Sequence, residues 1–298
     1  MATLAFDLGG TKLAAALVAA DGRLLRRAVS HTRPQAGASG WVDDMARFAE
    51  RWRSDFDRVG VAVTGAVRDG RWHALNRRIL DVGTDDYPLL DALAGRVGRA
   101  VHAANDAQAA AWGEYVRGAG RGTRDMVFLT VSTGIGGGIV LGGHLHRGAH
   151  ALAGHVGQIP HGEPEAPLED AAGGRALGYA YADGVSEAAP DAQAAFRAAS
   201  DGDGRAEAIV ERSATRVAWL CRTLQATLDP ELIVLGGGIG LAPGYLERVR
   251  HALAPHAGPL HPTLARADLG ADAGLVGIAD LARSVTPRST ARPTGRTT

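Results

Sequence analysis

The sequence predicts an α/β protein with two domains, and three observations support this prediction. The chain has 298 residues, 46% of them hydrophobic, which is enough for two cores of ordinary size. Short aliphatic runs typical of strands alternate along the chain with stretches of helical periodicity. Three strand-like runs lead into glycine turns at residues 9–10, 134–138 and 236–240. Because glycine lets backbone N–H groups approach an anion, these turns predict a nucleotide cleft.

The first part of the chain is expected to form a sheet. Strand signals cover residues 4–7, 13–18 and 59–63, where β-branched and aliphatic residues lie between turn residues. Between the last two, large apolar residues recur at four-three-four spacing, which predicts an amphipathic helix with this stripe in the core. The stripe consists of Trp41, Met45, Phe48 and Trp52. A second helix is expected over 89–97, followed by a short strand near 100–103.

The second part repeats this alternation of helices and strands. Alanine, which has the best helix propensity, dominates residues 106–117, and a strand is expected at 126–132. Apolar periodicity predicts a long helix over 209–228, with a strand at 232–235 behind it. A last helix is expected near 277–283.

Two stretches carry no periodic pattern. Residues 143–170 are rich in Gly, His, Pro and Glu, and we expect a long functional loop with little regular structure. Residues 284–298 are polar and contain no acidic or aromatic side chain, which predicts a disordered tail.

Charge and cysteine content narrow the class of protein. The 32 basic and 32 acidic residues cancel, so no overall field favours nucleic acid or an anionic membrane. No uncharged apolar stretch reaches the roughly 20 residues of a membrane span, and the first strand begins too early for a secretory signal. The single cysteine, Cys221, excludes a disulfide framework and a cysteine-rich zinc cluster. We therefore expect a cytoplasmic protein with neither nucleic-acid nor membrane partners.

The segment from Asp7 to Lys12 is the first candidate phosphate site. Gly9 and Gly10 allow a tight turn against an anion, Thr11 adds a hydroxyl group, and Lys12 adds a positive charge. Asp7 precedes the turn, where a carboxylate could hold Mg²⁺ bound to the phosphates. The alternative is an ordinary hairpin, because Gly-Gly between apolar runs is also a common two-residue turn.

The two later turns fit the same chemistry. Hydroxyl groups beside the second turn add hydrogen-bond donors, which suits a triphosphate held between two lobes. Neither turn has the glycine spacing of a dinucleotide-binding fingerprint, and the chain has no P-loop motif. The phosphate-binding residues expected here are Ser132, Thr133, Gly134, Gly136, Gly137, Gly236, Gly237 and Gly238.

Asn105 and Asp106 lie where the short strand near 100–103 meets the alanine-rich helix. Phosphoryl transfer to a hydroxyl group needs a carboxylate that accepts the hydroxyl proton, and Asp106 is the candidate for this base. Asn and Asp are also favoured helix caps, and local sequence alone favours the cap. One residue at such a junction can serve both purposes.

These motifs resemble those of the ROK family (repressors, open reading frames, kinases) in the sugar-kinase and actin-like ATPase superfamily. The resemblance runs over about residues 1–283. Residues 7–12 look like the first phosphate motif, 132–138 like the second, and 235–240 like the adenosine-side turn. Asn105-Asp106 is similar to the family's sugar-binding Asn and catalytic Asp.

The resemblance implies a two-lobed, ribonuclease H-like α/β fold with the active site in the interdomain cleft. It further implies a smaller lobe over residues 1–105 and a larger lobe over 106–283, ahead of the tail. The last helix is expected to pack back on the N-terminal lobe.

The resemblance also implies an activity. Residues 105–112, 125–134 and 152–157 are similar to the family members that phosphorylate N-acetylmannosamine. We therefore expect an ATP-dependent kinase that makes N-acetylmannosamine 6-phosphate in sialic acid catabolism, with Mg²⁺, as a homodimer. A glucokinase or an N-acetylglucosamine kinase is the alternative enzyme. A non-catalytic sugar sensor would be expected to lose the base or a phosphate motif, and neither is lost.

The family's sugar site can be carried over residue by residue. The sugar contacts implied by the resemblance are Gly65, Asn76, Asn105, Asp106, His155 and Glu169. His155 stands where sugar kinases of the family usually carry Glu, and some bacterial N-acetylmannosamine kinases carry His. Glu169 resembles the glutamate that accepts hydrogen bonds from sugar hydroxyls. A loop histidine and a solvated glutamate, both without a role, are the alternatives.

The chain departs from the family at the structural zinc site. ROK kinases usually bind zinc through a histidine and three cysteines, but Gln158 replaces that histidine and residues 161–167 replace the cysteine loop. Cys221 cannot make up for them, because zinc needs several converging ligands. We therefore expect no structural zinc. A substitute site would have to use His155, His161 and Glu163.

Overall fold

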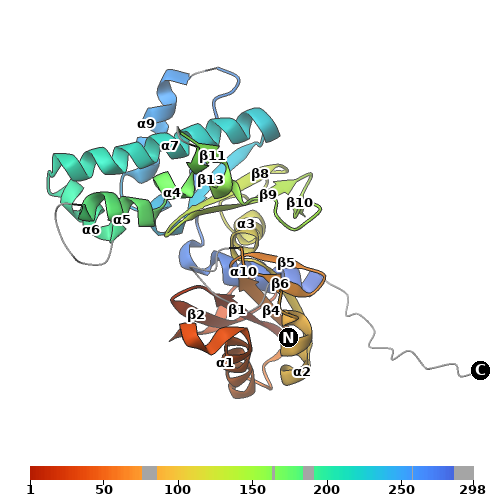
Figure 1. The fold of residues 1–298 in the computed structure, drawn as a ribbon. Helices are drawn as coiled ribbons and strands as arrows, with labels where there is room; N and C mark the ends of the chain where they lie inside the picture. Colours follow the sequence, from red (N-terminus) through yellow and green to blue (C-terminus); the bar gives the residue numbers. More distant parts are fainter. Residues whose placement is uncertain (76–85, 163–164, 184–190, 257, 285–298) are drawn as a thin grey trace, which may run out of the picture.

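A computed structural model describes residues 1–75, 86–162, 165–183, 191–256 and 258–284 (Figure 1). Within them the chain forms two five-stranded sheets with helices around and between them, which confirms the predicted α/β class. The predicted sugar contact Asn76, the alternative metal ligand Glu163, and all of the predicted tail except Ser284 lie outside the described residues. The boundary proposed between the lobes, at residues 105–106, stays a prediction.

The first sheet has the strand order β3-β2-β1-β4-β7. Its first three strands are antiparallel neighbours: β1 (Ala2–Leu8), β2 (Lys12–Val18) and β3 (Leu24–His31). On the other side of β1, β4 (Phe56–Val63) and β7 (Ala100–Asn105) join in parallel. The inner strands are aliphatic on both faces, as expected for strands covered by helices on both sides.

The three parallel strands of this sheet end in one row. Leu8 pairs with Val63, and Val63 pairs with Asn105. The first glycine turn and Asp106 follow Leu8 and Asn105 directly, and Gly65 comes two residues after Val63, so all three start from the same edge. In α/β proteins, ligands bind outside the carboxyl ends of parallel strands.

Helices α1 (Gly37–Arg51) and α2 (Leu89–Val97) pack on each other and share a core with this sheet. Trp41 and Met45 of the predicted aromatic stripe are buried there, which confirms the amphipathic helix. A small hairpin of β5 (Ala66–Arg68) and β6 (Arg71–His73) follows β4, and Trp72 in it is buried against the same core.

The second sheet repeats the arrangement of the first, with the order β10-β9-β8-β13-β14. Its antiparallel neighbours are β8 (Met126–Val131), β9 (Ile135–Leu141) and β10 (His144–His146). On the other side of β8, β13 (Leu232–Gly236) and β14 (Leu264–Arg266) join in parallel. Each sheet is therefore a three-stranded meander extended by two parallel strands.

The long helix α7 (Gly204–Leu228) forms the core of the second half together with α9 (Tyr245–Leu253). The Asp203 side chain caps α7 by accepting hydrogen bonds from two backbone N–H groups, and Asp229 ends the helix in the left-handed region. The smaller helices of this half are α4 (Glu169–Ala172), α5 (Gly174–Ala182), α6 (Ala192–Ser200) and α8 (Gly237–Gly240). The 3₁₀ turns of the chain are η1 (Pro34–Ala36), η2 (Val156–Gln158), η3 (Ala254–His256) and η4 (Gly270–Asp272).

Two helices that pack against each other connect the two sheets. α3 (Asp106–Arg117) follows the first sheet but packs on β8 and β9 of the second, whereas α10 (Ala273–Ser284) follows the second sheet but packs on the first. In Figure 1 the two helices lie between the sheets. A Cβ atom on Gly277 would lie 1.8 Å from the Ala109 carbonyl oxygen, so glycine is required for this close crossing. α10 begins four residues before the predicted helix at 277.

The predicted loop at 143–170 contains more regular structure than expected. It holds β10, η2 and a two-residue strand pair of β11 (Pro160–His161) and β12 (Ala166–Pro167). These pieces are too short for their periodicity to be recognised in the sequence. The segment after β10 is therefore a folded insertion that packs against β9.

Candidate active site

The first glycine turn closes the hairpin between β1 and β2. The Gly9 N–H group donates a hydrogen bond to the Lys12 carbonyl oxygen at 3.0 Å. Thr32, at the end of β3, holds the turn from below: its hydroxyl donates to the Gly9 carbonyl at 2.8 Å and its N–H to the Thr11 carbonyl at 3.0 Å. The turn is thus a hairpin, as both interpretations require, and the exposed Thr11 and Lys12 side chains leave the phosphate contact a prediction.

Asp7 and Asp106 form a coupled pair of carboxylates at this sheet edge. The pKa of Asp7 is raised to about 7, chiefly by burial and also by the negative charge of Asp106, while Lys12 opposes both effects. A Cβ atom on Gly274, in the first turn of α10, would lie 3.2 Å from the Asp7 carboxylate, so glycine lets the helix approach. Two carboxylates at one edge provide oxygen ligands of the kind that Mg²⁺ prefers.

Burial also raises the pKa of Asp106, the predicted base. The Ala107 N–H group, which donates to Asp106 Oδ1 at 2.8 Å, and the nearby His155 both act in the opposite direction. The charge of Asp106 thus acts on Asp7, and His155 acts on Asp106. A carboxylate with a raised pKa is a stronger base than one in water.

Asn105 is the N-cap of α3, as local sequence favoured. Its Oδ1 accepts from the Gln108 N–H at 3.0 Å, and its Nδ2 donates to the Gly65 carbonyl oxygen at 2.8 Å. Gly65 has a φ of +90°, and a Cβ atom there would lie 2.4 Å from the His73 carbonyl oxygen. The predicted sugar contacts Gly65 and Asn105 are thus brought together, and they fix the start of the helix that carries Asp106.

The second glycine turn is shorter than predicted. It consists of residues 132–134, where the Ser132 N–H group donates to the Gly134 carbonyl at 2.9 Å, and β9 begins at Ile135. Gly136 and Gly137 were predicted as turn residues, and that prediction is wrong because both lie within β9. A Cβ atom on Gly137 would lie 2.8 Å from the Phe128 carbonyl oxygen, so close strand packing explains this glycine.

The first residues of helix α5 hold the second turn in place through two backbone hydrogen bonds. The Gly174 N–H group donates to the Ser132 carbonyl oxygen at 2.7 Å, and the Arg175 N–H donates to the Thr133 carbonyl at 3.0 Å. With their carbonyls held, Ser132 and Thr133 leave their side chains exposed. Both hydroxyl groups can therefore reach an anion at this end of the sheet.

The third turn lies beside the second. Gly236 ends β13 opposite Thr130 of β8, so the two turns leave the sheet at neighbouring strand ends. Gly237 has a φ of +84°, and a Cβ atom there would lie 2.5 Å from the Val131 carbonyl oxygen. Gly238 is exposed in α8. The predicted grouping of the second and third turns is reproduced, and Gly237 is the position where the backbone requires glycine.

Glu169, the predicted sugar glutamate, lies against the second turn. Its Oε1 accepts from Gln158 Nε2 at 2.7 Å, and its Oε2 accepts from the Ile135 N–H at 3.3 Å. A Cβ atom on Gly134 would lie 2.4 Å from Oε2, so this glycine makes room for the carboxylate. Gln158, which replaces the family's zinc-binding histidine, thus orients Glu169 directly.

His155 presents one ring nitrogen that has no partner. Its Nδ1 lies 3.0 Å from the Leu152 carbonyl oxygen, which can only accept, so Nδ1 carries the proton. In the neutral ring Nε2 is then an acceptor; it is buried and has no hydrogen-bond partner within the described part of the chain. Nε2 is therefore available to a hydroxyl group: the neutral ring would accept a hydrogen bond from it, and the protonated ring would donate one.

Gln108 is a residue of the site that the sequence argument missed. It is buried in α3, two residues after Asp106, and its Nε2 donates to the Ala153 and Ala151 carbonyls at 2.9 and 3.4 Å. Ala151 has a φ of +58°, a strained conformation for a residue other than glycine. Gln108 thus ties the segment that carries His155 to the helix that carries Asp106. Its one visible signal was a polar residue within an alanine-rich run.

No group of three or more His, Cys, Asp or Glu side chains could hold a metal ion within the described residues. The donor set does not fit the family's zinc site, because Gln158 is engaged with Glu169, and Cys221 is buried in α7, where burial raises the pKa of its thiol to about 12. The described helices also include none that is long and apolar enough to cross a membrane.

Comparison with known proteins agrees with this geometry. A model of the ROK family matches residues 3–285. The bifunctional enzyme NanE/NanK of Brucella melitensis is 46% identical over 282 residues, covering 94% of this chain and 53% of that protein. This chain therefore spans about half the length of that relative. The N-acetylmannosamine kinase of Escherichia coli is 41% identical over 291 residues, covering 95% of this chain and 99% of the relative.

A solved structure extends the comparison to the fold. The ROK family glucokinase from Streptomyces griseus, crystallised in complex with glucose and AMPPNP, superposes with a TM-score of 0.84 at 32% identity. The superposition covers 95% of this chain and 99% of that one. The two-lobed sugar-kinase architecture is therefore shared over nearly the whole length of both chains.

Proposed function

We propose a function from one premise: the chain belongs to the ROK family. We infer that it is a sugar kinase that transfers the γ-phosphoryl group of ATP to the 6-hydroxyl of N-acetylmannosamine. The observation that carries the proposal is the position of Asp7 and Asp106 at the carboxyl ends of the parallel strands β1 and β7, with His155 close enough to lower the pKa of Asp106. The likeness to the Escherichia coli N-acetylmannosamine kinase over nearly its whole length supports this substrate.

Asp106 would act as the general base. Its carboxylate takes the proton of the sugar 6-hydroxyl while that oxygen attacks the γ-phosphorus and the bond to the leaving ADP oxygen breaks. Burial raises the pKa of Asp106, which strengthens it as a base. A base of this kind contributes about 10²–10⁴-fold in rate, and alignment and charge neutralisation supply the rest.

The three glycine turns would hold ATP. Thr11 and Lys12 extend from the first turn, Ser132 and Thr133 from the second, and all four side chains are exposed. Gly236, Gly237 and Gly238 form the third turn, beside the second. Lys12 is the only lysine of the chain, so arginine serves at every other basic position. An ammonium group is a compact point charge, which suits the close approach to a phosphate at a tight turn.

Mg²⁺ fits the carboxylate pair. Bound together with the ATP phosphates, the ion would neutralise charge on the transferred group. Asp7 would hold it, since its carboxylate lies at the strand end beside the first turn, with Asp106 nearby. Burial and the charge of Asp106 both raise the pKa of Asp7, and the positive charge of the ion would oppose both effects.

The sugar would lie between Asp106 and the second turn. His155 accepts from one hydroxyl through Nε2, and Glu169 accepts from others while Gln158 and the Ile135 N–H group keep its carboxylate in place. Asn105, fixed to Gly65, would complete the site. The acceptors on His155 and Glu169 favour a ring with several free hydroxyl groups.

Three further properties belong to the proposal. The reaction would serve sialic acid catabolism, the enzyme would work in the cytoplasm where ATP is available, and it would be a homodimer. A glucokinase remains the second candidate, since the Streptomyces griseus relative is a glucokinase at 32% identity.

A coupled ADP-release assay tests the proposal on N-acetylmannosamine, N-acetylglucosamine, mannose and glucose side by side. N-acetylmannosamine is expected to give the highest kcat/KM. Equal or higher kcat/KM on glucose would overturn this assignment in favour of the glucokinase. No ADP release on any of the four sugars would overturn the kinase itself.

A further inference from the structure

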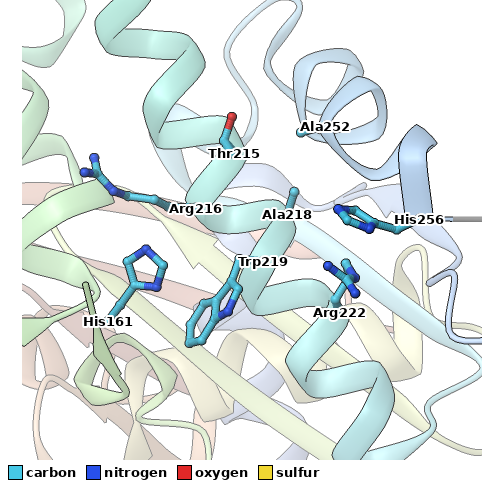
Figure 2. Close-up of a pocket in the computed structure, with 8 residues that line it drawn as sticks. All are labelled: His161, Thr215, Arg216, Ala218, Trp219, Arg222, Ala252 and His256. Carbon is cyan, nitrogen blue, oxygen red and sulfur yellow. The ribbon is translucent and has the colours of Figure 1, made fainter. Parts of the chain in front are cut away.

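The outer face of α7 carries a pocket of about 260 Å³, separate from the strand ends that carry the candidate active site (Figure 2). α7 contributes most of its walls, and the rest come from β11, α9 and η3. The lining residues are His161, Thr215, Arg216, Ala218, Trp219, Arg222, Ala252 and His256. These include two guanidinium groups and two imidazoles but no carboxylate, so the lining favours an anion.

The positive charge of this pocket is not balanced by α7 itself. The two carboxylates of α7 are Glu207 and Glu211, and Arg248 on α9 binds both of them. Arg222 is half-buried and forms no ion pair or hydrogen bond with any residue that the structure describes. A guanidinium group presents a planar fork of donors that matches a phosphate group. Arg222 is therefore free to bind one.

An aromatic wall lies beside the charged residues. The His161 and Trp219 rings are 4.5 Å apart between centroids, at 52° to each other, and both rings line the pocket. Trp219 is only half-buried, so its face can pack on the apolar face of a sugar ring. The pocket is smaller than the roughly 300–1,000 Å³ of sites for drug-sized ligands, which favours a monosaccharide over a nucleotide.

We propose that this pocket binds a sugar phosphate, with the phosphate on Arg222 and His256 and the ring on Trp219. A sugar phosphate bound in this pocket would affect the sugar site of the candidate active site through two connections. His161 belongs to β11, whose partner strand β12 runs directly into α4, where Glu169 is the first residue. Arg216 donates from Nη1 to the Ala171 carbonyl oxygen of the same short helix at 2.9 Å. The effect on sugar affinity rests on the proposed function, whereas the binding itself does not.

Binding is measured by titrating the protein with glucose 6-phosphate in a calorimeter, with uncharged glucose as the ligand control. Arg222→Gln removes the free guanidinium and is expected to weaken glucose 6-phosphate binding at least about tenfold, which is about 1.4 kcal/mol. Arg212→Gln is the matched control, because Arg212 is an exposed residue of the same helix that does not line the pocket; affinity should change less than about twofold. Trp219→Phe should remove the ligand-dependent change in tryptophan fluorescence.

Equal affinity of the wild type and Arg222→Gln for glucose 6-phosphate would contradict the proposed site. The ligand would then bind elsewhere, for example in the active site. Absence of binding up to about 10 mM glucose 6-phosphate would also overturn it. The binding free energy would then be weaker than about 3 kcal/mol. A lower molar mass of Arg222→Gln in light scattering would overturn it in favour of an interface between two copies of the chain.

Discussion

The two sheets of this protein share one strand order, but the turns at their first hairpins are held in different ways. In the first sheet, Thr32 at the end of β3 holds the turn after β1 with two hydrogen bonds, and the chain then continues into η1 and α1. In the second sheet, the turn after β8 is held by Glu169, from the insertion that follows β10, and by α5, which comes shortly after that insertion.

This difference separates the two tasks of a sugar kinase. The features common to both halves, a tight turn with exposed hydroxyl groups at a strand end, suit ATP phosphates. The features found only in the second half, His155 and Glu169, suit the sugar hydroxyls. We therefore expect changes in the first turn to affect ATP, changes in the insertion to affect the sugar, and changes at Asp106 to affect the reaction itself.

The largest effect is expected at Asp106, where the halves meet. Asp106→Asn removes the proton acceptor, so kcat should fall by roughly 10²–10⁴-fold while the fold is retained. Steady-state ADP release, with circular dichroism to verify folding, measures this loss. Asp91→Asn, an exposed aspartate in α2, is the control and should leave kcat unchanged. A folded Asp106→Asn variant with wild-type kcat would disprove the role of the base.

The next effect is expected in the first turn. Lys12→Met removes the only ammonium side chain and should raise the KM for ATP about tenfold, with the sugar KM changed less than about twofold. The single lysine also allows a chemical test, since an amine-reactive reagent can label only Lys12 and the N-terminus. Mass spectrometry should show that ATP protects Lys12 from labelling and that the sugar alone does not. Equal labelling of Lys12 with and without ATP would contradict a phosphate contact.

The close crossing of α3 and α10 between the two sheets predicts an effect on stability. In Gly277→Ala the new methyl group would collide with the Ala109 carbonyl, so the free energy of unfolding should fall by roughly 1–3 kcal/mol. Gly95→Ala is the matched control, because Gly95 is exposed in α2 with no atom near its Cβ position, and this change should stabilise by about 0.5–1 kcal/mol. Chemical denaturation measures both. A neutral Gly277→Ala would show that the two helices can separate at low cost.

The smallest effect is expected from Asp7 in the absence of metal. Burial and Asp106 raise the pKa of Asp7 to about 7, so the folded state retains a proton that the unfolded state has already lost. The stability contributed by this proton is present at low pH and is lost as pH rises toward about 7. The melting temperature of the wild type should therefore fall by a few degrees relative to Asp7→Asn between about pH 5 and about pH 8. Parallel pH profiles of the melting temperature in the two proteins would show that the pKa of Asp7 is not raised in the folded state.

Much of this fold could be predicted from the sequence. The strands expected at 4–7, 13–18 and 59–63 lie within β1, β2 and β4, because continuous aliphatic runs are a strong signal. β3 was missed because it is an edge strand with two arginines and a histidine among its exposed residues. β9 was missed because its glycines indicate a turn as much as a strand. The resulting error at Gly136 and Gly137 comes from the same ambiguity.

The candidate site could be predicted in part. Asp7 and Asp106 each follow from local sequence, and their proximity follows from the carboxyl ends of parallel strands. The contacts of Gln108 and Gln158 could not be predicted, because they depend on how the insertion folds back on α3 and β9. A polar side chain in a loop or an alanine-rich helix gives no sign of the carbonyl or carboxylate that it will bind.

The separation of tasks between the two halves is tested most directly by measuring both Michaelis constants of Glu169→Gln. This change keeps the size of the side chain but replaces an acceptor with a donor facing Gln158, and Asp170→Asn, an exposed neighbour, is the control. We predict that the KM for N-acetylmannosamine rises at least about tenfold while the KM for ATP changes less than about twofold. An equal rise in both constants, or no rise in the sugar constant, would contradict the account.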